Sequence, residues 1–347
     1  MSAVFDTPAF DNHEQVIFCS DASTGLQAII AIHATSLGPA AGGCRMYPYE
    51  TPQMALNDAL RLSRGMSYKN ALAGLKLGGG KAVIIADPNA PDKSQLLTAF
   101  ARHVQTLGGR YWTAIDVGVG VDDVALIARE TNYVFCRVDE RSGRLNPATY
   151  TALGGFVGLK TSVRHALGRD DLVGVRFALQ GLGQTGFDLC QRLIEAGGSV
   201  VASDVDQSTT ERAHRSLGVA IVDPQEIYDQ AADVFVPCAL GAILNDSTIP
   251  RLKVRVVCGL ANNQLAEPRH GQLMLDRGIV YAPDYVVNAG GVIYGSDDIF
   301  KTHDTSQAET LIAGIDGVLS DIFCTSDRTR RPTSEIADEL ARSRMVS

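Results

Sequence analysis

Features that would direct this chain to a membrane or a nucleic acid are missing from its 347 residues. No apolar run approaches the roughly 20 residues that a membrane-spanning helix needs. The first residues contain neither a basic segment nor the apolar core of a signal peptide. The formal net charge of −8 disfavours a nucleic acid or an anionic membrane as a partner. These absences predict a cytoplasmic protein.

Signs of a disulfide framework or a metal site are also missing. The seven cysteines include no pair at C-x-x-C spacing, and their number is odd. Such cysteines are typical of reduced thiols that pack as small hydrophobic residues. The seven histidines are scattered, with none paired at helical spacing. We therefore expect no metal site.

The chain is long and apolar enough for two domains. Hydrophobic residues make up 45% of it, and its length is typical of a two-domain protein. We predict a first domain at residues 1–147 and a second at 148–331, with a connecting helix at 147–167. A helix is expected in the tail at 332–347, where it would pack back on the first domain.

Helix and strand patterns alternate along the whole chain. In the first half, Thr51-Pro52 predicts the start of a helix that runs to about Met66. Further helices are predicted at 94–107 and 121–131, and short strands at 82–86 and 111–113. In the second half, strands are predicted at 175–180, 199–203, 219–222, 234–237, 254–258 and 279–282. Strands that alternate with helices indicate a parallel sheet covered on both faces.

A dinucleotide-binding fingerprint opens the second half. Gly181, Gly183 and Gly186 form G-x-G-x-x-G between a predicted strand and a predicted helix. In this motif the first glycine makes the tight turn, the second admits the pyrophosphate, and the third lets helix and strand pack closely. Asp204, at the end of the next strand, would accept a ribose hydroxyl and repel a 2′-phosphate. The sequence therefore favours NAD as cofactor over NADP; the alternative is a doubly wound domain with an empty glycine turn.

Two lysines twelve residues apart carry most of the chemical information. Lys69 lies in the segment MSYKNA, and Lys81 follows three glycines and opens an apolar run. A lysine crowded by backbone is partly stripped of water, so a lowered pKa and a role as a base are expected. The alternative for each is a solvated lysine. A phosphate-binding loop is disfavoured, because Ala82 stands where that motif needs Ser or Thr.

Seven segments, in this order, resemble the glutamate/leucine/phenylalanine/valine dehydrogenases, most of all the leucine and phenylalanine branch. They are GPAAGGCRM (38–46), GMSYKNA (65–71), GGGK (78–81), TAIDV (113–117), PCALG (237–241), ANNQ (261–264) and APDYVVNAGG (282–291). The resemblance implies an α/β fold with an N-terminal mixed-sheet catalytic domain and a C-terminal Rossmann-like NAD-binding domain. It also implies a homo-oligomer that reversibly deaminates an L-amino acid to its 2-oxo acid and ammonia, with NAD as oxidant.

The family's roles transfer to the residues that match its motifs. Lys81 would be the base that activates water, and Asp116 would carry protons to and from the amino group. The substrate carboxylate would be held by Lys69 and by the turn at Gly42 and Gly43. Asn263 would orient the substrate, and the nicotinamide half of the cofactor would lie against Thr151, Ala239 and Asn262.

Ordinary structural roles are the alternatives for three of these residues. Asp116 could be a helix-capping or surface aspartate, Lys69 a solvated lysine, and Asn263 a turn residue. Asp284 and Asn288 are interpreted as capping a turn and are not assigned to the site.

The resemblance also predicts an apolar substrate. Relatives specific for glutamate place a lysine and a serine where this chain has Ala41 and Gly295, and neither residue can pair with a carboxylate. With Ala114 and Val292, these small residues would leave a roomy pocket. A branched-chain or broad apolar specificity is predicted first, and an aromatic substrate (phenylalanine or tryptophan) second.

One departure from the family pattern follows Asp116. Relatives commonly have Gly-Thr-Thr where this chain has Gly118-Val119-Gly120, and the loss of a hydroxyl is expected to loosen the loop that positions Asp116. This departure supports a second alternative, a non-catalytic protein that binds NAD and an amino acid. A hydroxy-acid dehydrogenase is disfavoured, because no histidine stands in a glycine-rich or strand-end setting.

Overall fold

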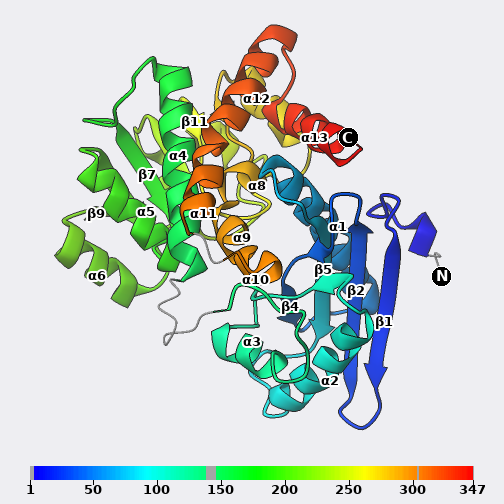
Figure 1. The fold of residues 1–347 in the computed structure, drawn as a ribbon. Coiled ribbons are helices and arrows are strands. Elements are labelled where there is room, and N and C mark those ends of the chain that lie inside the picture. The colour runs from blue at the N-terminus through cyan, green and yellow to red at the C-terminus, as the bar shows by residue number, and fades with distance from the viewer. Residues whose placement is uncertain (1–3, 138–145, 303–304, 347) are drawn as a thin grey trace. The chain divides into compact units, whose positions relative to one another are not determined.

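The computed structural model describes residues 4–137, 146–302 and 305–346 (Figure 1). They form two compact units. The first unit comprises Met1–Leu145, Val292–Thr305 and Ala341–Ser347, and the second comprises Asn146–Gly291 and Ser306–Leu340. The break at residue 145 lies beside the boundary predicted at 147, whereas the assignment of Val292–Thr305 to the first unit has no counterpart in the prediction.

The first unit is built on a mixed six-stranded sheet. Its strand order is β1-β2-β5-β3-β6, and β4 also pairs with β5. Strands β1, β2 and β5 are antiparallel neighbours, while β3 and β4 run parallel to β5, and β6 runs parallel to β3. The strand bounds are β1 Gln15–Asp21, β2 Leu26–Ala34, β3 Ala40–Ala41, β4 Cys44–Tyr47, β5 Gly78–Ile85 and β6 Tyr111–Trp112.

Helices cover both faces of this sheet. Successive strand residues point to opposite faces, and apolar residues occupy both. Ile29 and Ala31 of β2 and Val83 of β5 pack against helix α1 (Pro52–Leu72). The intervening residues, such as Ile30 and Ala82, belong to the core on the side of α2 (Lys93–Thr106). Strand β5, buried along almost its whole length, is therefore held between two layers of helices.

Several predicted elements of the first unit have different bounds in the structure, such as α3 (Val121–Ile127), which ends at Ile127 rather than near 131, and two of the differences concern a lysine. Helix α1 was predicted to end near Met66 but continues to Leu72, so Lys69 lies in its last turn. Strand β5 was predicted from residue 82 but begins at Gly78, so the three glycines and Lys81 belong to the strand. Glycine normally weakens a strand, but here each of these glycines is pressed against neighbouring backbone or an aromatic ring.

The second unit is built on a parallel six-stranded sheet in the order β12-β11-β10-β7-β8-β9. The order reverses between β7 and β10, as in doubly wound dinucleotide-binding folds. The strand bounds are β7 Arg176–Gln180, β8 Ser199–Ser203, β9 Ala220–Ile221, β10 Val234–Pro237, β11 Val256–Val257 and β12 Val280–Tyr281. With the mixed sheet of the first unit, this sheet confirms the predicted α/β fold class and its Rossmann-like second half.

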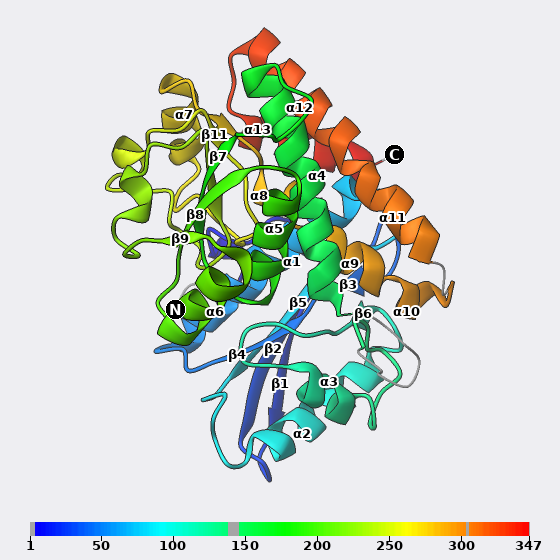
Figure 2. The same ribbon diagram turned by 90° about the vertical axis from the view of Figure 1, so that its left-hand side faces the viewer.

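The remaining helices lie around these sheets (Figures 1 and 2). Their bounds are η1 Val4–Asp6, α3 Val121–Ile127, α4 Pro147–Leu167, α5 Gln184–Glu195, α6 Gln207–Leu217, η3 Ile227–Asp229, η4 Ile249–Arg251, α7 Arg269–Asp276, α8 Asp284–Val287, α9 Gly290–Gly295, α10 Asp297–Phe300, α11 Thr305–Ala313, α12 Ile315–Thr329 and α13 Thr333–Met345. Within the described residues, no helix is both long and apolar enough to cross a bilayer.

The end of the chain returns to helix α1. Arg342, near the end of α13, donates from Nε to the Tyr68 hydroxyl at 2.8 Å. Arg344 donates to the carbonyl oxygen of Leu72 at 2.9 Å, where a cation complements the exposed carbonyls of a helix C-terminus. All four residues belong to the first unit. Ser347, the last residue of the predicted tail, lies outside the described residues.

Candidate active site

The structure brings Lys81 and Asp116 into contact. Lys81 lies in β5, and Asp116 follows β6, at the end of a short segment that pairs with the strand region around Cys44. The Lys81 Nζ lies 2.7 Å from Asp116 Oδ2, and the two side chains are only 8% and 14% exposed. A buried amine and carboxylate at this distance form a charge-assisted hydrogen bond, along which a proton can pass.

Close backbone packing at Gly42 and Gly43 makes this contact possible. A Cβ at Gly42 would collide with the carbonyl oxygen of Gly80, directly before Lys81. A Cβ at Gly43 would collide with the carbonyl oxygen of Ile115, directly before Asp116. The two glycines therefore lie between the segments that carry Lys81 and Asp116, and any larger residue would push those segments apart.

Helix α1 places Lys69 on the same side of the sheet. A Cβ at Gly79 would collide with the backbone nitrogen of Ser67, so the last turns of α1 lie directly on β5. Lys81 shares this face with Gly79, because alternate strand residues point to the same side. Lys69 follows Ser67 by two residues and is half-buried.

Positive charges hold the carboxyl group of Asp116 in its ionised form. Burial by itself would raise the pKa of Asp116, but the cations of Lys81 and Arg45 outweigh it, so this pKa lies below its ordinary value. Arg45 donates from Nε to Asp116 Oδ2 at 3.1 Å. The site therefore contains a carboxylate with two cationic partners.

Arg45 and the residues behind it were not assigned a role from the sequence. Arg45 lies in the quoted segment GPAAGGCRM, but its contact with Asp116 joins residues 71 apart, and its other partner, Asp58, lies on α1. Tyr49 also donates to Asp58, at 2.7 Å. Nothing in the spacing of these residues indicates the contacts; only the alternation in β4, with Cys44 and Met46 in the core beside α2, places Arg45 on the opposite face.

The loop after Asp116 is closed by its own backbone. The Asp116 nitrogen donates to the Val119 oxygen at 3.1 Å, and the Val119 nitrogen donates to the Asp116 oxygen at 2.9 Å. Gly118 has a φ of +77°, and a Cβ there would collide with the Met46 oxygen. These backbone hydrogen bonds form without the hydroxyl whose loss was expected to loosen the loop.

The residues predicted to form the substrate pocket all belong to the first unit. Ala41 and Ala114 are buried on neighbouring segments beside β3 and β6, and Val292 and Gly295 belong to helix α9. The space in front of Gly295 is not empty, because a Cβ there would collide with the Cys136 sulfur. Cys136 has a φ of +58° and was not assigned to the pocket from the sequence. The expected room at position 295 is therefore taken by this thiol.

In the second unit, the glycine turn has the form that a dinucleotide needs. Gly181 has a φ of +97°, and a Cβ at Gly186 would collide with the Gly181 oxygen, so helix α5 lies tightly on the turn. A Cβ at Gly183 would meet no atom within 4 Å, which leaves its face open to a ligand. Asp204 Oδ2 accepts a hydrogen bond from the Leu182 nitrogen at 2.6 Å, so the carboxylate lies at this turn. The residues present fit the pyrophosphate and ribose of a dinucleotide.

The residues predicted beside the nicotinamide lie on loops that are tied to one another. A Cβ at Gly181 would lie 2.8 Å from Ala239, so the ends of β7 and β10 meet at the point where the strand order reverses. Asn262 Oδ1 accepts from Asn288 Nδ2 at 2.8 Å, and the backbone nitrogen of Asn263 donates to Asp284. Asp284 and Asn288, interpreted from the sequence as turn caps, thus hold both predicted asparagines. Thr151, in α4, would touch a Cβ placed on Gly291.

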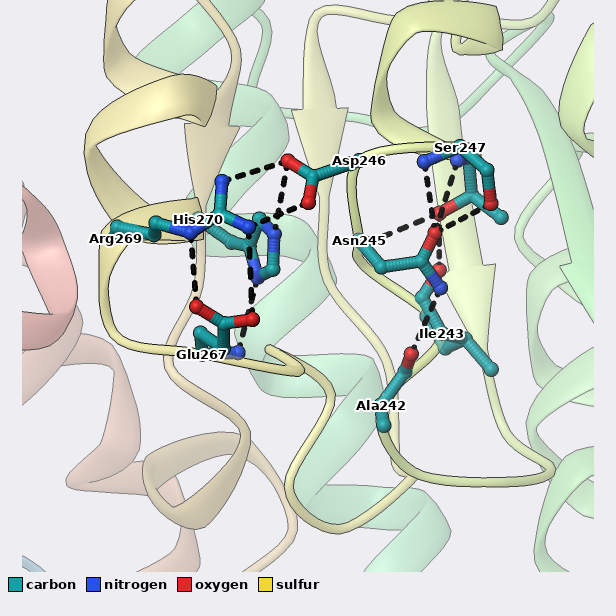
Figure 3. A network of polar contacts seen from close by, with 9 residues as sticks. Ala242, Ile243, Asn245, Asp246, Ser247, Glu267, Arg269 and His270 are labelled. Atoms are coloured by element: carbon teal, nitrogen blue, oxygen red, sulfur yellow. Dashed lines mark hydrogen bonds and ion pairs between the residues drawn. The ribbon is translucent and has the colours of Figure 1, made fainter.

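A polar network reinforces the same loops from outside (Figure 3). Arg269 donates to Glu267 at 2.8 Å and to Asp246 at 2.7 Å, and the Glu267 nitrogen donates to His270 Nδ1 at 2.9 Å. Asn245 Oδ1 accepts from the backbone nitrogen of Ser247 at 3.0 Å, which closes a turn. The ion pair of Arg269 with Asp246 joins the loop after β10 to the start of α7.

The predicted residues therefore fall into two sets. Gly42, Gly43, Lys69, Lys81 and Asp116 come together in the first unit. Asn263, although predicted to bind substrate, belongs to the second unit with the predicted cofactor residues. Across the described ranges, no three His, Cys, Asp or Glu residues are grouped as metal ligands.

Comparison with known proteins identifies similar families and relatives. The dimerisation domain of Glu/Leu/Phe/Val dehydrogenases matches residues 13–133, and the glutamate/leucine/phenylalanine/valine dehydrogenase domain matches residues 205–306. Leucine dehydrogenase of Bacillus subtilis is 46% identical over 96% of this chain and 92% of its own length. Valine dehydrogenase of Streptomyces virginiae is 45% identical over 96% of this chain and 94% of its own. Phenylalanine dehydrogenase of Caldalkalibacillus thermarum is 44% identical over 98% and 94%.

Solved structures show the same architecture. L-tryptophan dehydrogenase from Nostoc punctiforme superimposes with a TM-score of 0.82 at 42% identity, over 96% of both chains. Hetero-hexameric glutamate dehydrogenase from Thermus thermophilus superimposes with a TM-score of 0.78 at 21% identity, over 96% of this chain and 88% of its own. The second likeness shows the shared fold alone.

Proposed function

Because the chain belongs to the glutamate/leucine/phenylalanine/valine dehydrogenase family of oxidoreductases, as its sequence predicted, we propose that it reversibly deaminates an apolar L-amino acid, with NAD as oxidant. The products are the 2-oxo acid, ammonia and NADH. The observation that carries the proposal is the buried contact of Lys81 with Asp116, at 2.7 Å.

The residues of the first unit have separate tasks in this reaction. Lys69 attracts the substrate carboxylate, and Gly42 and Gly43 keep the backbone beside it free of side chains. A bound nicotinamide supplies the acceptor for the hydride that leaves the substrate Cα, which becomes an iminium carbon. Lys81 in its neutral form takes a proton from the water that attacks this carbon. Asp116 accepts and returns the protons of the departing amino group.

An apolar substrate follows from residues that carry no charge. Ala41 and Gly295 stand where the glutamate-specific pattern has a lysine and a serine, and burying an unpaired side-chain carboxylate costs several kcal/mol. Leucine, valine and phenylalanine dehydrogenases are 46%, 45% and 44% identical to the chain, so overall identity does not choose among their substrates. We infer a branched-chain or broad apolar preference, because the Cys136 thiol fills the space in front of Gly295.

An aromatic substrate is the second candidate. Ala41 and Ala114 are small, buried side chains that would leave room for a larger substrate, and the tryptophan dehydrogenase structure is similar over almost the whole chain. A methylene more or less in an apolar pocket changes specificity by only about 1–3 kcal/mol, so several substrates can be accepted.

The cofactor, the assembly and the location complete the proposal. NAD is favoured over NADP because the Asp204 carboxylate lies at the glycine turn, where it would repel a 2′-phosphate. A homo-oligomer is supported by the similarity of residues 13–133 to a dimerisation domain. The cytoplasmic location stays a prediction from the sequence.

Formation of NADH at alkaline pH from Leu, Val, Met, Phe, Trp and Glu tests the proposal. We expect turnover of the apolar amino acids and none of glutamate. Lys81→Ala should lower kcat roughly 10²–10⁴-fold, the usual contribution of a general base. The matched control is Lys76→Ala, because Lys76 is exposed and lies just before the same strand.

Two outcomes would contradict this function. Undiminished activity of Lys81→Ala would exclude the assigned base. Binding of NADH and leucine without turnover by the unaltered protein would favour the non-catalytic alternative.

A further inference from the structure

Asp116 has a second cationic partner that the reaction described above does not use. Its Oδ2 atom lies 2.7 Å from Lys81 Nζ and 3.1 Å from Arg45 Nε. The two cations approach from neighbouring strands, β5 and β4. The carboxylate would therefore keep one positive partner if the other became neutral.

Arg45 is itself fixed from its far side. Its Nη1 atom donates to Asp58 Oδ2 at 2.8 Å, and the Tyr49 hydroxyl donates to the same oxygen at 2.7 Å. The side chains of Arg45 and Asp58 are 18% and 13% exposed. A planar guanidinium bound along two edges has little rotational freedom, so its Nε–H is aimed at Asp116 by Asp58 on helix α1.

We propose that Arg45 is a positioning residue that keeps Asp116 ionised and in place while Lys81 is neutral, and that Asp58 and Tyr49 hold Arg45 in position. The inference rests on the proposed function, in which Lys81 must give up its proton to act as a base. A buried carboxylate with a neutral lysine as its sole partner would tend to take up a proton. An arginine stays charged when Lys81 loses its proton, so Asp116 can remain ionised whether Lys81 is charged or neutral.

Three further titratable groups of the described residues interact electrostatically with Asp116, and none of them can replace this charge. They are the Cys44 thiol and the Tyr49 and Tyr111 hydroxyls. Burial raises the pKa of each of these three groups well above its ordinary value, so all three are neutral at neutral pH. Arg45 is thus the permanent positive charge in contact with Asp116.

The pH dependence of kcat/KM tests the role of Arg45. Arg45→Gln should move the acid limb of the profile upward by roughly one pH unit or more, because loss of the adjacent positive charge disfavours loss of protons from the coupled Lys81–Asp116 pair. Asp58→Asn should move the acid limb in the same direction by a smaller amount. Arg45→Lys keeps a positive charge, so its acid limb should move less than that of Arg45→Gln. The matched control is Arg61→Gln: Arg61 donates to the other oxygen of Asp58, at 2.9 Å, and is largely exposed.

A second readout is independent of turnover. Titration of the Asp116 carboxyl carbon by NMR, assigned by the loss of its signal in Asp116→Asn, should show a higher pKa in Arg45→Gln than in the unaltered chain. An inactive unaltered protein would refute the proposed function and leave this titration to decide about Arg45.

Unchanged titration and an unchanged acid limb in a folded Arg45→Gln protein would overturn the inference. If that variant does not fold, Arg45→Lys and Asp58→Asn decide in its place. Equal profiles for Asp58→Asn and Arg61→Gln would then overturn the positioning role.

Discussion

The two units build their candidate sites from different materials. In the first unit the site consists of charged side chains: Lys81, Asp116, Arg45 and Asp58 form a continuous chain of contacts in a largely buried setting. In the second unit it consists mainly of bare backbone, with Gly181, Gly183 and Gly186 at its centre. The comparison predicts that the proposed reaction depends on which side chains are present, and cofactor binding on where side chains are absent.

This difference has consequences for stability as well as for function. Buried charges in the first unit must stay paired, because an unpaired charge in a protein interior is costly. A glycine turn has no such requirement, but it tolerates added atoms only where no neighbouring atom lies close. We therefore expect the first unit to respond to pH and the second to respond to the size of its residues.

Acid should expose this contrast most strongly, through His33. Burial lowers the pKa of His33 to about 4, below its ordinary value of 6.5. A lowered folded-state pKa means that protonation favours the unfolded chain. The contribution of His33 to the free energy of unfolding is therefore complete above pH 6.5. It is lost as the pH falls to 4, an effect on the order of 3 kcal/mol.

Fluorescence of Trp112 can report this loss. It is the chain's one tryptophan and lies in β6 of the first unit, so urea midpoints measured between pH 7 and 4 follow that unit. His33→Gln should flatten the pH dependence, whereas His103→Gln, on α2, should not. Equal slopes for His33→Gln and the unaltered chain would refute the assignment to His33.

Adding single methyl groups to the glycine turn should separate folding from binding in the second unit. Gly186→Ala meets the Gly181 oxygen and should lower stability by about 1–3 kcal/mol, as overpacking usually does. Gly183→Ala meets no protein atom, so it should keep stability but weaken NADH binding at least several-fold. Thermal unfolding and NADH fluorescence titration measure the two effects.

Gly317→Ala, in helix α12, is the matched control. It also meets no atom within 4 Å, and alanine in a helix should stabilise by about 0.5–1 kcal/mol. A Gly183→Ala protein with unchanged NADH affinity would show that the open side of the turn does not face the cofactor.

How much the sequence could predict also differs between the two units. The parallel sheet of the second unit was predicted strand by strand, because strong apolar runs alternate with helices, and all six strands appear near the expected positions. In the first unit, β1 and β2 were not predicted. Lys69 was placed after a helix that in fact includes it. Local patterns do not contain the pairing partners that define a mixed sheet.

The site shows the same limit in more detail. Lys81 and Asp116 could be chosen because each lies in a recognisable segment. Arg45 lies in such a segment too, but its role depends on contacts with Asp116 and Asp58 that only the paired strands and α1 create. The Cys136 thiol packs against Gly295, which lies 159 positions away, and no local pattern indicates this contact.

The smallest expected effect concerns Asp204, a charged side chain at the glycine turn of the second unit. Both of its oxygens accept backbone hydrogen bonds, from Leu182 at 2.6 Å and Asp206 at 3.0 Å, so its charge is fixed beside the turn. Asp204→Ser removes the repulsion of a 2′-phosphate and should shift the ratio of kcat/KM for NADP over NAD upward by roughly 10–100-fold, about 1.4–2.7 kcal/mol. Asp206→Ser, two residues along in the same loop, is the matched control and should leave the ratio unchanged. An equal ratio in both variants would mean that cofactor choice, like the pyrophosphate site, is made by backbone alone.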